Sequence, residues 1–83
     1  MKVMAEVSFV AEAAMRRLNL KYRRVDRPTD VLSFPLDDFK PGPDGIIRLG
    51  DIVICKSQAK KTGHAISFLI KHAMLHLLGS HHQ

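Results

Sequence analysis

Positions 72 to 82 of the chain read HAMLHLLGSHH and hold four of its five histidines. His72 and His76 are four residues apart, so on a helix they lie one turn apart on the same face. Gly79 follows three residues later, where we expect the helix to end in a left-handed residue. The chain can then turn back and bring His82 towards the helical pair. Three neutral imidazoles suit Zn²⁺ and leave a fourth position open for water, which is typical of a catalytic metal site.

The residues before this stretch predict the helix that carries the histidine pair. Apolar side chains recur there at helical spacing, at Ile66, Leu69, Ile70, Ala73 and Leu77. We therefore expect a buried helix over residues 64–78, with both histidines beside its apolar stripe. A short basic helix is expected over residues 56–62, and Gly63 is expected to end it.

The rest of the chain predicts three strands and one further helix. The strands are expected over residues 3–9, 31–34 and 49–54, and the helix over residues 11–22. Alternation in the first strand predicts one buried face, and the apolar run Ile52-Val53-Ile54 predicts that the last strand is central. Residues 36–48 are rich in Asp, Pro and Gly, which is typical of a hairpin-like connection or a mobile loop. The expected fold class is α+β, a small central sheet packed with helices.

Length, charge and cysteine content restrict the class of protein. The 83 residues are expected to form a single domain, 1–83, with a thin core. The net charge of +5 favours a polyanionic partner, although a basic protein with no nucleic-acid role has the same composition. The lone cysteine, Cys55, excludes an internal disulfide, fits a reducing compartment and is expected to be buried. No apolar run reaches transmembrane length, so we expect a cytoplasmic protein with no membrane partner.

The histidines allow other interpretations. A histidine pair on a helix can be an ordinary half-buried pair, the GSHH at positions 79–82 is similar to an affinity-tag linker, and the cluster can be a structural metal site. The spacing His-x-x-x-His-x-x-Gly-x-x-His also resembles that of the metzincin proteases. Those carry Glu directly after the first histidine as general base, and here that position is Ala73. A zinc-dependent metallopeptidase therefore remains only an alternative.

Four segments in order resemble one known family. They read LNLKYR at 18–23, DRPTDVLSFP at 26–35, LGDIVI at 49–54 and HAMLHLLGSHH at 72–82. Together they closely resemble the YbeY family of bacterial rRNA maturation factors, which are metal-dependent, single-strand-specific endoribonucleases.

The resemblance implies a site, a substrate and a cofactor. It implies an α+β fold with one Zn²⁺ held by His72, His76 and His82, and it places the functionally important arginine of the family at Arg23. It further implies a single-stranded RNA substrate, with a role at the small ribosomal subunit in rRNA maturation and ribosome quality control. No DNA partner is expected. The alternative is an RNA- or ribosome-binding domain whose metal only stabilises the fold.

The chain departs from the family pattern at several positions. Family members are usually longer than this chain. The family usually has Gly where this chain has Arg24 and Ala73, and Tyr-Asp where it has Ser80-His81. Loss of the acidic residue removes a possible partner for a metal ligand. It also makes His81 a rival of His82 as the third ligand.

Other side chains are weaker candidates for cleavage and binding. Asp30 and Asp51 are candidate general bases, although turn and capping roles are commoner for such residues. Ser33 is a candidate contact for the RNA backbone. Four lysines form a candidate basic face, or only a solvated one, namely Lys56, Lys60, Lys61 and Lys71. The aromatic residues are too few and too scattered to predict a base-stacking surface, namely Phe9, Tyr22, Phe34, Phe39 and Phe68.

Overall fold

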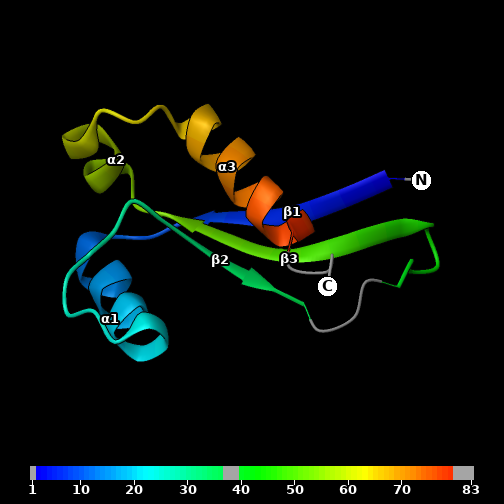
Figure 1. The fold of residues 1–83 in the computed structure, drawn as a ribbon, viewed down its shortest axis with the longest axis horizontal. Helices are drawn as coiled ribbons and strands as arrows, with labels where there is room; N and C mark the ends of the chain where they lie inside the picture. The colour runs from blue at the N-terminus through cyan, green and yellow to red at the C-terminus, as the bar shows by residue number, and fades with distance from the viewer. Residues whose placement is uncertain (1, 37–39, 80–83) are drawn as a thin grey trace.

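The structure is a computed structural model that describes residues 2–36 and 40–79 of the chain. Its elements follow in the order β1 (Lys2–Phe9), α1 (Glu12–Arg23), β2 (Val31–Pro35), β3 (Ile46–Ile54), α2 (Lys56–Thr62) and α3 (Ile66–Gly79). Figure 1 shows α3 lying across the sheet, with α1 and α2 near one end of the strands. The predicted α+β class and the predicted order of elements are confirmed.

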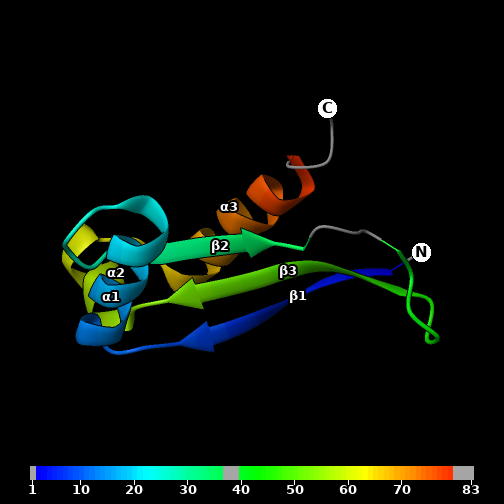
Figure 2. The same ribbon diagram turned by 90° about the horizontal axis from the view of Figure 1, so that it is seen from below.

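The three strands form one mixed sheet in the order β1-β3-β2, with β3 in the centre as predicted (Figure 2). β3 runs parallel to β1 and antiparallel to β2. It begins at Ile46, three residues earlier than expected, because the turn before it is tight. The Gly42 N–H donates to the Ile46 carbonyl at 3.0 Å, and Pro41 bridges to Ile47. The hairpin-like connection predicted for this region is therefore present.

Two apolar clusters lie on opposite faces of the sheet. On one face, Ala73 and Leu77 of α3 pack against Leu49, Ile52 and Ile54 of β3, all at most 3% exposed. On the other face, Met15 of α1 packs with the cluster formed by Leu32, Val53 and Cys55. Ile52 and Ile54 belong to one cluster and Val53 to the other, because successive side chains of a strand point to opposite faces. The sheet is therefore covered by α3 on one side and by α1 on the other, and Cys55 is buried as expected.

A distortion at Gly50 makes this packing possible. Leu49 and Ile52 are three residues apart, so a regular strand would place them on opposite faces, yet both pack against α3. The pairing of β1 with β3 shifts between Met4 and Ala5, opposite Leu49. Gly50 has φ 148°, and a Cβ atom there would overlap the carbonyl oxygen of Phe34 and lie 2.9 Å from the Cα of Pro35. Only glycine fits this position without a shift of the backbone of β2.

The prediction that β1 has one buried face is wrong. Val3, Val7 and Phe9 are 45%, 38% and 49% exposed. β1 lies at an edge of the sheet, while α3 packs over β2 and β3. Alternation in the sequence indicates a strand, but the position of the covering helix decides whether a face is buried.

The ends of the helices agree only in part with the predictions. Gly63 ends α2 in the left-handed conformation, with φ 75°, as predicted. Gly79 is instead the last residue of α3, so the left-handed cap expected there is wrong. At the end of α1 the left-handed residue is Arg24, with φ 58°, and its N–H donates to the Leu20 carbonyl at 3.1 Å. In the described part of the chain, no helix has the length and apolar character needed to cross a membrane.

We predict that alanine changes the free energy of unfolding differently at two glycines. Gly50→Ala should lower the free energy of unfolding by at least about 2 kcal/mol, because the new methyl group meets β2 and the φ angle is unfavourable for alanine. Gly79→Ala is the control: it lies in a helix with open space around it. It should leave stability unchanged or raise it by up to about 1 kcal/mol. Urea unfolding followed by circular dichroism measures both, and equal effects would contradict the role given to Gly50.

Candidate functional site

A cleft of about 800 Å³ lies between the C-terminal end of α1, the strand β2 and one flank of α3. It is lined by Tyr22, Arg23, Thr29, Asp30, Val31, Leu32, Ser33, Phe34, His64, Phe68, Leu69, His72, Ala73 and His76. The sequence-predicted residues Arg23, Ser33, Asp30, His72 and His76 are thus brought to one place, although they come from three separate segments.

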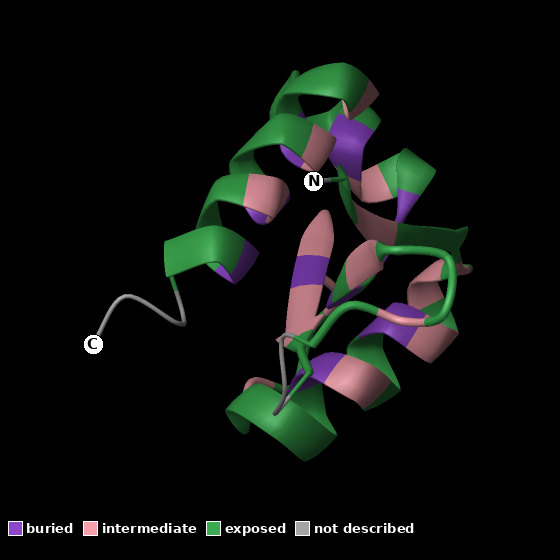
Figure 3. Cartoon of the chain, turned by 90° about the vertical axis from the view of Figure 1, so that its right-hand side faces the viewer, coloured by how far each residue is buried: buried purple, intermediate pink, exposed green. Residues whose placement is uncertain are grey.

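The core packing of α3 turns the histidine pair into this cleft. Leu69, Ala73 and Leu77 are buried at 2%, 3% and 0%, and Figure 3 shows the buried side of the helix facing the strands. Each candidate histidine lies one residue before a buried position, which is about 100° around the helix. His72 and His76 are therefore exposed at the flank beside β2. Their ring centroids are 4.5 Å apart, with the planes inclined by 51°.

The histidine pair has the donor chemistry of a transition-metal site but does not complete one by itself. Two imidazoles one helical turn apart are suitable ligands for Zn²⁺. Over residues 2–36 and 40–79, no group of three or more His, Cys, Asp or Glu side chains gathers as a metal site would require. His82 and its rival His81 lie outside the described residues. The three-histidine site therefore remains a prediction, and the described pair fits two of its three ligands.

Arg23 and Arg24 have different positions although they are neighbours in the sequence. Arg23 is the last residue of α1, and its exposed side chain lines the cleft. Arg24 is the left-handed cap of the same helix and is not among the described residues that line the cleft. Its φ of 58° is a conformation that favours glycine, the residue that the family resemblance predicts at this position.

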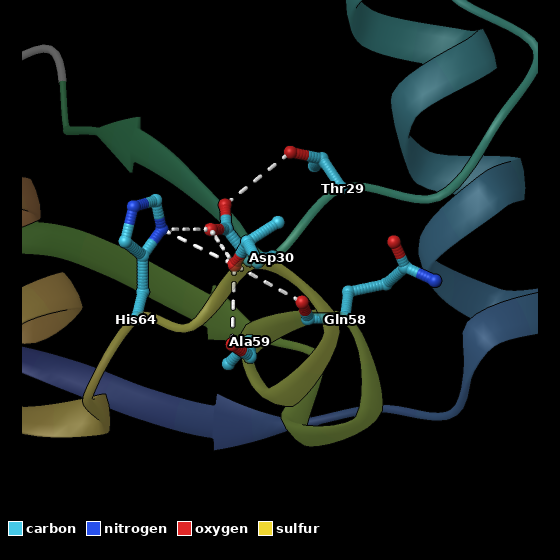
Figure 4. A network of polar contacts seen from close by, with 6 residues as sticks. Thr29, Asp30, Gln58, Ala59 and His64 are labelled. Atoms are coloured by element: carbon cyan, nitrogen blue, oxygen red, sulfur yellow. Dashed lines mark hydrogen bonds and ion pairs between the residues drawn. The ribbon is translucent and has the colours of Figure 1, made fainter.

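A hydrogen-bonded network includes Asp30 and His64, two of the residues that line the cleft (Figure 4). His64 Nδ1 lies 2.8 Å from Asp30 Oδ2, and the Thr62 hydroxyl lies 3.2 Å from the same oxygen. Burial opposes ionisation of Asp30 most strongly, but hydrogen bonds from His64 and Thr62 outweigh it, so the pKa of Asp30 is lowered from its ordinary value of 3.8. The network joins the start of β2 to the end of α2. Asp30 is thus held by partners within the fold, which favours a structural role for it over that of a free general base.

The outer edge of β2 adds backbone groups to the cleft. The Cys55 N–H donates to the Asp30 carbonyl, and the Leu36 N–H donates to the Leu49 carbonyl. Because bonded and non-bonded pairs alternate in an antiparallel ladder, the N–H and C=O groups of Val31 and Ser33 point away from β3. Ser33 therefore offers both its side chain and its backbone groups. Pro35 fits the same pattern, since its missing N–H falls on the outward side.

The second candidate carboxylate and the candidate basic face lie elsewhere. Asp51 lines a separate cavity of about 780 Å³ together with Glu6, rather than the cleft described above. Among the four candidate lysines none is a described lining residue of the cleft. Lys61 pairs with Glu12 at 3.1 Å, and the ammonium of Lys56 lies 4.5 Å from the ring centre of Phe9. Two of the four lysines thus make local contacts that join α2 to the start of α1 and the end of β1.

The interpretation of the aromatic residues as scattered is wrong for three of the five. Tyr22, Phe34 and Phe68 all line the cleft, while Phe39 lies outside the described residues. His64 was not singled out by sequence reasoning at all. A signal for His64 and Phe68 was available, because positions 64, 68, 72 and 76 carry aromatic or imidazole rings at intervals of four.

These features define an α+β chain with a histidine pair and an arginine in one cleft. The sequence model of the family described as Endoribonuclease YbeY matches residues 1–83. Proteins named Endoribonuclease YbeY are similar to the chain: one from Finegoldia magna is 47% identical over 92% of the chain, and one from Caldanaerobacter subterraneus is 41% identical over 99% of it. Another, from Campylobacter jejuni, is 44% identical over 94%. The chain spans 54%, 63% and 61% of the length of these relatives, respectively. It belongs to the Endoribonuclease YbeY family.

The lowered pKa of Asp30 predicts a pH-dependent contribution to stability. A carboxylate whose pKa is lower in the folded state stabilises the fold above its unfolded pKa, and this stabilisation is lost as the pH falls through the folded value. Asp30→Asn should therefore lower the free energy of unfolding by about 1–3 kcal/mol at pH 7, and by clearly less near pH 3. Urea unfolding at both pH values measures the difference.

Asp51→Asn is the matched control for this experiment, because it removes the same charge from an exposed position on β3. It should change the free energy of unfolding by less than about 0.5 kcal/mol at either pH. If Asp30→Asn lost the same stability at pH 3 as at pH 7, the ionised network would not be the cause.

Proposed function

We propose that the chain is a zinc-dependent endoribonuclease that cleaves single-stranded RNA in rRNA maturation and ribosome quality control at the small ribosomal subunit, in the cytoplasm. The observation that carries this proposal is that Arg23, His72 and His76 line one cleft in a chain of this family. The net charge of +5 agrees with a polyanionic substrate.

The proposed ligands are His72 and His76 of α3 and His82 beyond it. A bound Zn²⁺ supplies a Lewis acid and a water molecule of lowered pKa. The helix fixes the first two imidazoles one turn apart, since their neighbours Ala73 and Leu77 are held in the core. A rigid pair of this kind orders two of the ligands before the metal binds, which lowers the entropic cost of forming the site.

Arg23 is the proposed phosphate-binding residue. Its guanidinium can donate two parallel hydrogen bonds to non-bridging phosphate oxygens. In the transition state of cleavage, negative charge grows on these oxygens, so a fixed cation at the cleft stabilises that state more than the ground state. The outward N–H of Ser33 is a further donor for the same backbone.

A metallopeptidase is the second candidate, and one observation favours it. In the part of the chain that the structure describes, no strand pairs with the outer edge of β2 beside the histidine pair, so an extended peptide can add there as a strand. Ala73, however, is 3% exposed and packed in the core where a metzincin carries its general base. An assay with an unfolded protein substrate tests this candidate alongside the RNA assay, and cleavage of peptide but not of RNA would favour it.

We predict that three variants separate the roles of the cleft residues in cleavage of single-stranded RNA. His76→Ala should lose both bound Zn²⁺ and cleavage, because one ligand is missing. Arg23→Ala should keep Zn²⁺ but lose cleavage by about 100-fold or more, as expected when a donor to the developing charge is removed. The measurements are metal content and initial cleavage rates of purified, tag-free protein.

Arg24→Gly is the matched control for Arg23→Ala. It removes the same charge one residue away, from a position that suits glycine. It should retain both Zn²⁺ and cleavage. Zinc-loaded wild type that binds RNA without cleaving it would instead support the alternative, an RNA- or ribosome-binding domain whose metal only stabilises the fold.

A further inference from the structure

Phe68 is a large apolar side chain at the rim of the cleft. It is 52% exposed and lies on the flank of α3, one residue before the buried Leu69. It belongs neither to the buried core clusters nor to the apolar residues packed against them. When a second flat apolar surface covers an exposed aromatic ring, the ring leaves water and the contact is stabilised.

The neighbours of Phe68 hold its ring beside the histidine pair. The ring centroid lies 5.9 Å from that of His72, with the two planes inclined by only 13°. The centroid also lies 5.4 Å from that of His64, but the two planes are inclined by 41°, so this contact is not a stacked one. The His64 imidazole is in turn hydrogen-bonded to Asp30. The aromatic ring is therefore ordered and lies one helical turn from a proposed metal ligand.

The wall of the cleft opposite Phe68 carries the guanidinium of Arg23. Arg23 is the last residue of α1, which packs on the other face of the sheet from α3. The cleft therefore passes over the outer edge of β2, between the ring of Phe68 and the guanidinium of Arg23. Tyr22 on this wall is 55% exposed, but Phe34 and the ammonium of Lys21 lie 4.9 and 5.2 Å from its ring centre. Phe68 is thus the aromatic side chain beside the histidine pair, and Arg23 is the group across from it.

We infer that Phe68 stacks on an unpaired base of the RNA while Arg23 holds the backbone phosphate, and that this contact selects single-stranded over paired RNA. The inference rests on the proposed function. A base in a duplex has both faces covered by its neighbours, whereas an unpaired base can turn out and stack on a protein ring. Such stacking tolerates any base, because each has a flat π face. Phe68 then determines whether the chain prefers single-stranded or paired RNA, and it does not determine which base sequence is bound.

Binding of a fluorescent RNA tests the inference. The probe is a short single-stranded 2′-O-methyl RNA with one 2-aminopurine, titrated with the zinc-loaded chain and checked on a gel for intactness. Wild type should quench the fluorescence of 2-aminopurine as the base stacks. Phe68→Leu should bind about 5- to 100-fold more weakly and with less quenching, and its preference for single-stranded over duplex RNA should fall by a similar factor. Phe68→Trp should restore both the affinity and the quenching.

Leu75→Ala is the matched control. Leu75 is 59% exposed on the same helix but is not a described lining residue of the cleft, so its loss should change neither affinity nor quenching. Equal affinity and quenching for Phe68→Leu and wild type would overturn the stacking contact and leave the proposed endoribonuclease intact. Loss of Zn²⁺ in Phe68→Leu with unchanged quenching would also overturn it, because Phe68 would then only orient His72. A wild-type chain that binds no single-stranded RNA would overturn both proposals.

Discussion

The packing of α3 on β3 is the contact on which the rest of the structure depends. Leu69, Ala73 and Leu77 lie at intervals of four and are all buried, two of them directly against the apolar side chains of β3. This contact fixes the rotation of α3 about its own axis. Gly50 is part of it, because the distorted strand places Leu49 on the same face as Ile52.

The candidate site follows from that rotation together with the position of α1. Once positions 69, 73 and 77 face the sheet, positions 68, 72 and 76 must lie on the flank beside β2. On the other face, burial of Met15 directs the end of α1 and therefore Arg23 to the same edge strand. The cleft thus lies between elements from both faces of the sheet, along the outer edge of β2. This arrangement brings an aromatic ring, two imidazoles, a guanidinium and the outward backbone groups of β2 to one cleft.

The sequence predicts what is periodic and local, and it misses what depends on contacts far along the chain. The helical spacing around His72 and His76, the central position of β3 and the break at Gly63 could all be predicted. The exposure of β1 could not, because it depends on where α3 lies. The hydrogen bond between Asp30 and His64 spans 34 residues and the ion pair of Glu12 with Lys61 spans 49, so neither has a local signal.

The proposed cleavage and the stacking on Phe68 both require RNA to occupy the cleft between α1 and α3. Nuclear magnetic resonance of the ¹⁵N-labelled, zinc-loaded chain, titrated with cleavage-resistant single-stranded RNA, tests this requirement most directly at a size of 9.3 kDa. We expect the largest changes in amide chemical shift at the end of α1, along β2 and on the cleft flank of α3, at Arg23, Ser33 and Phe68. Changes centred on the lysines of α2 or on the exposed face of β1, with the cleft unaffected, would contradict this expectation.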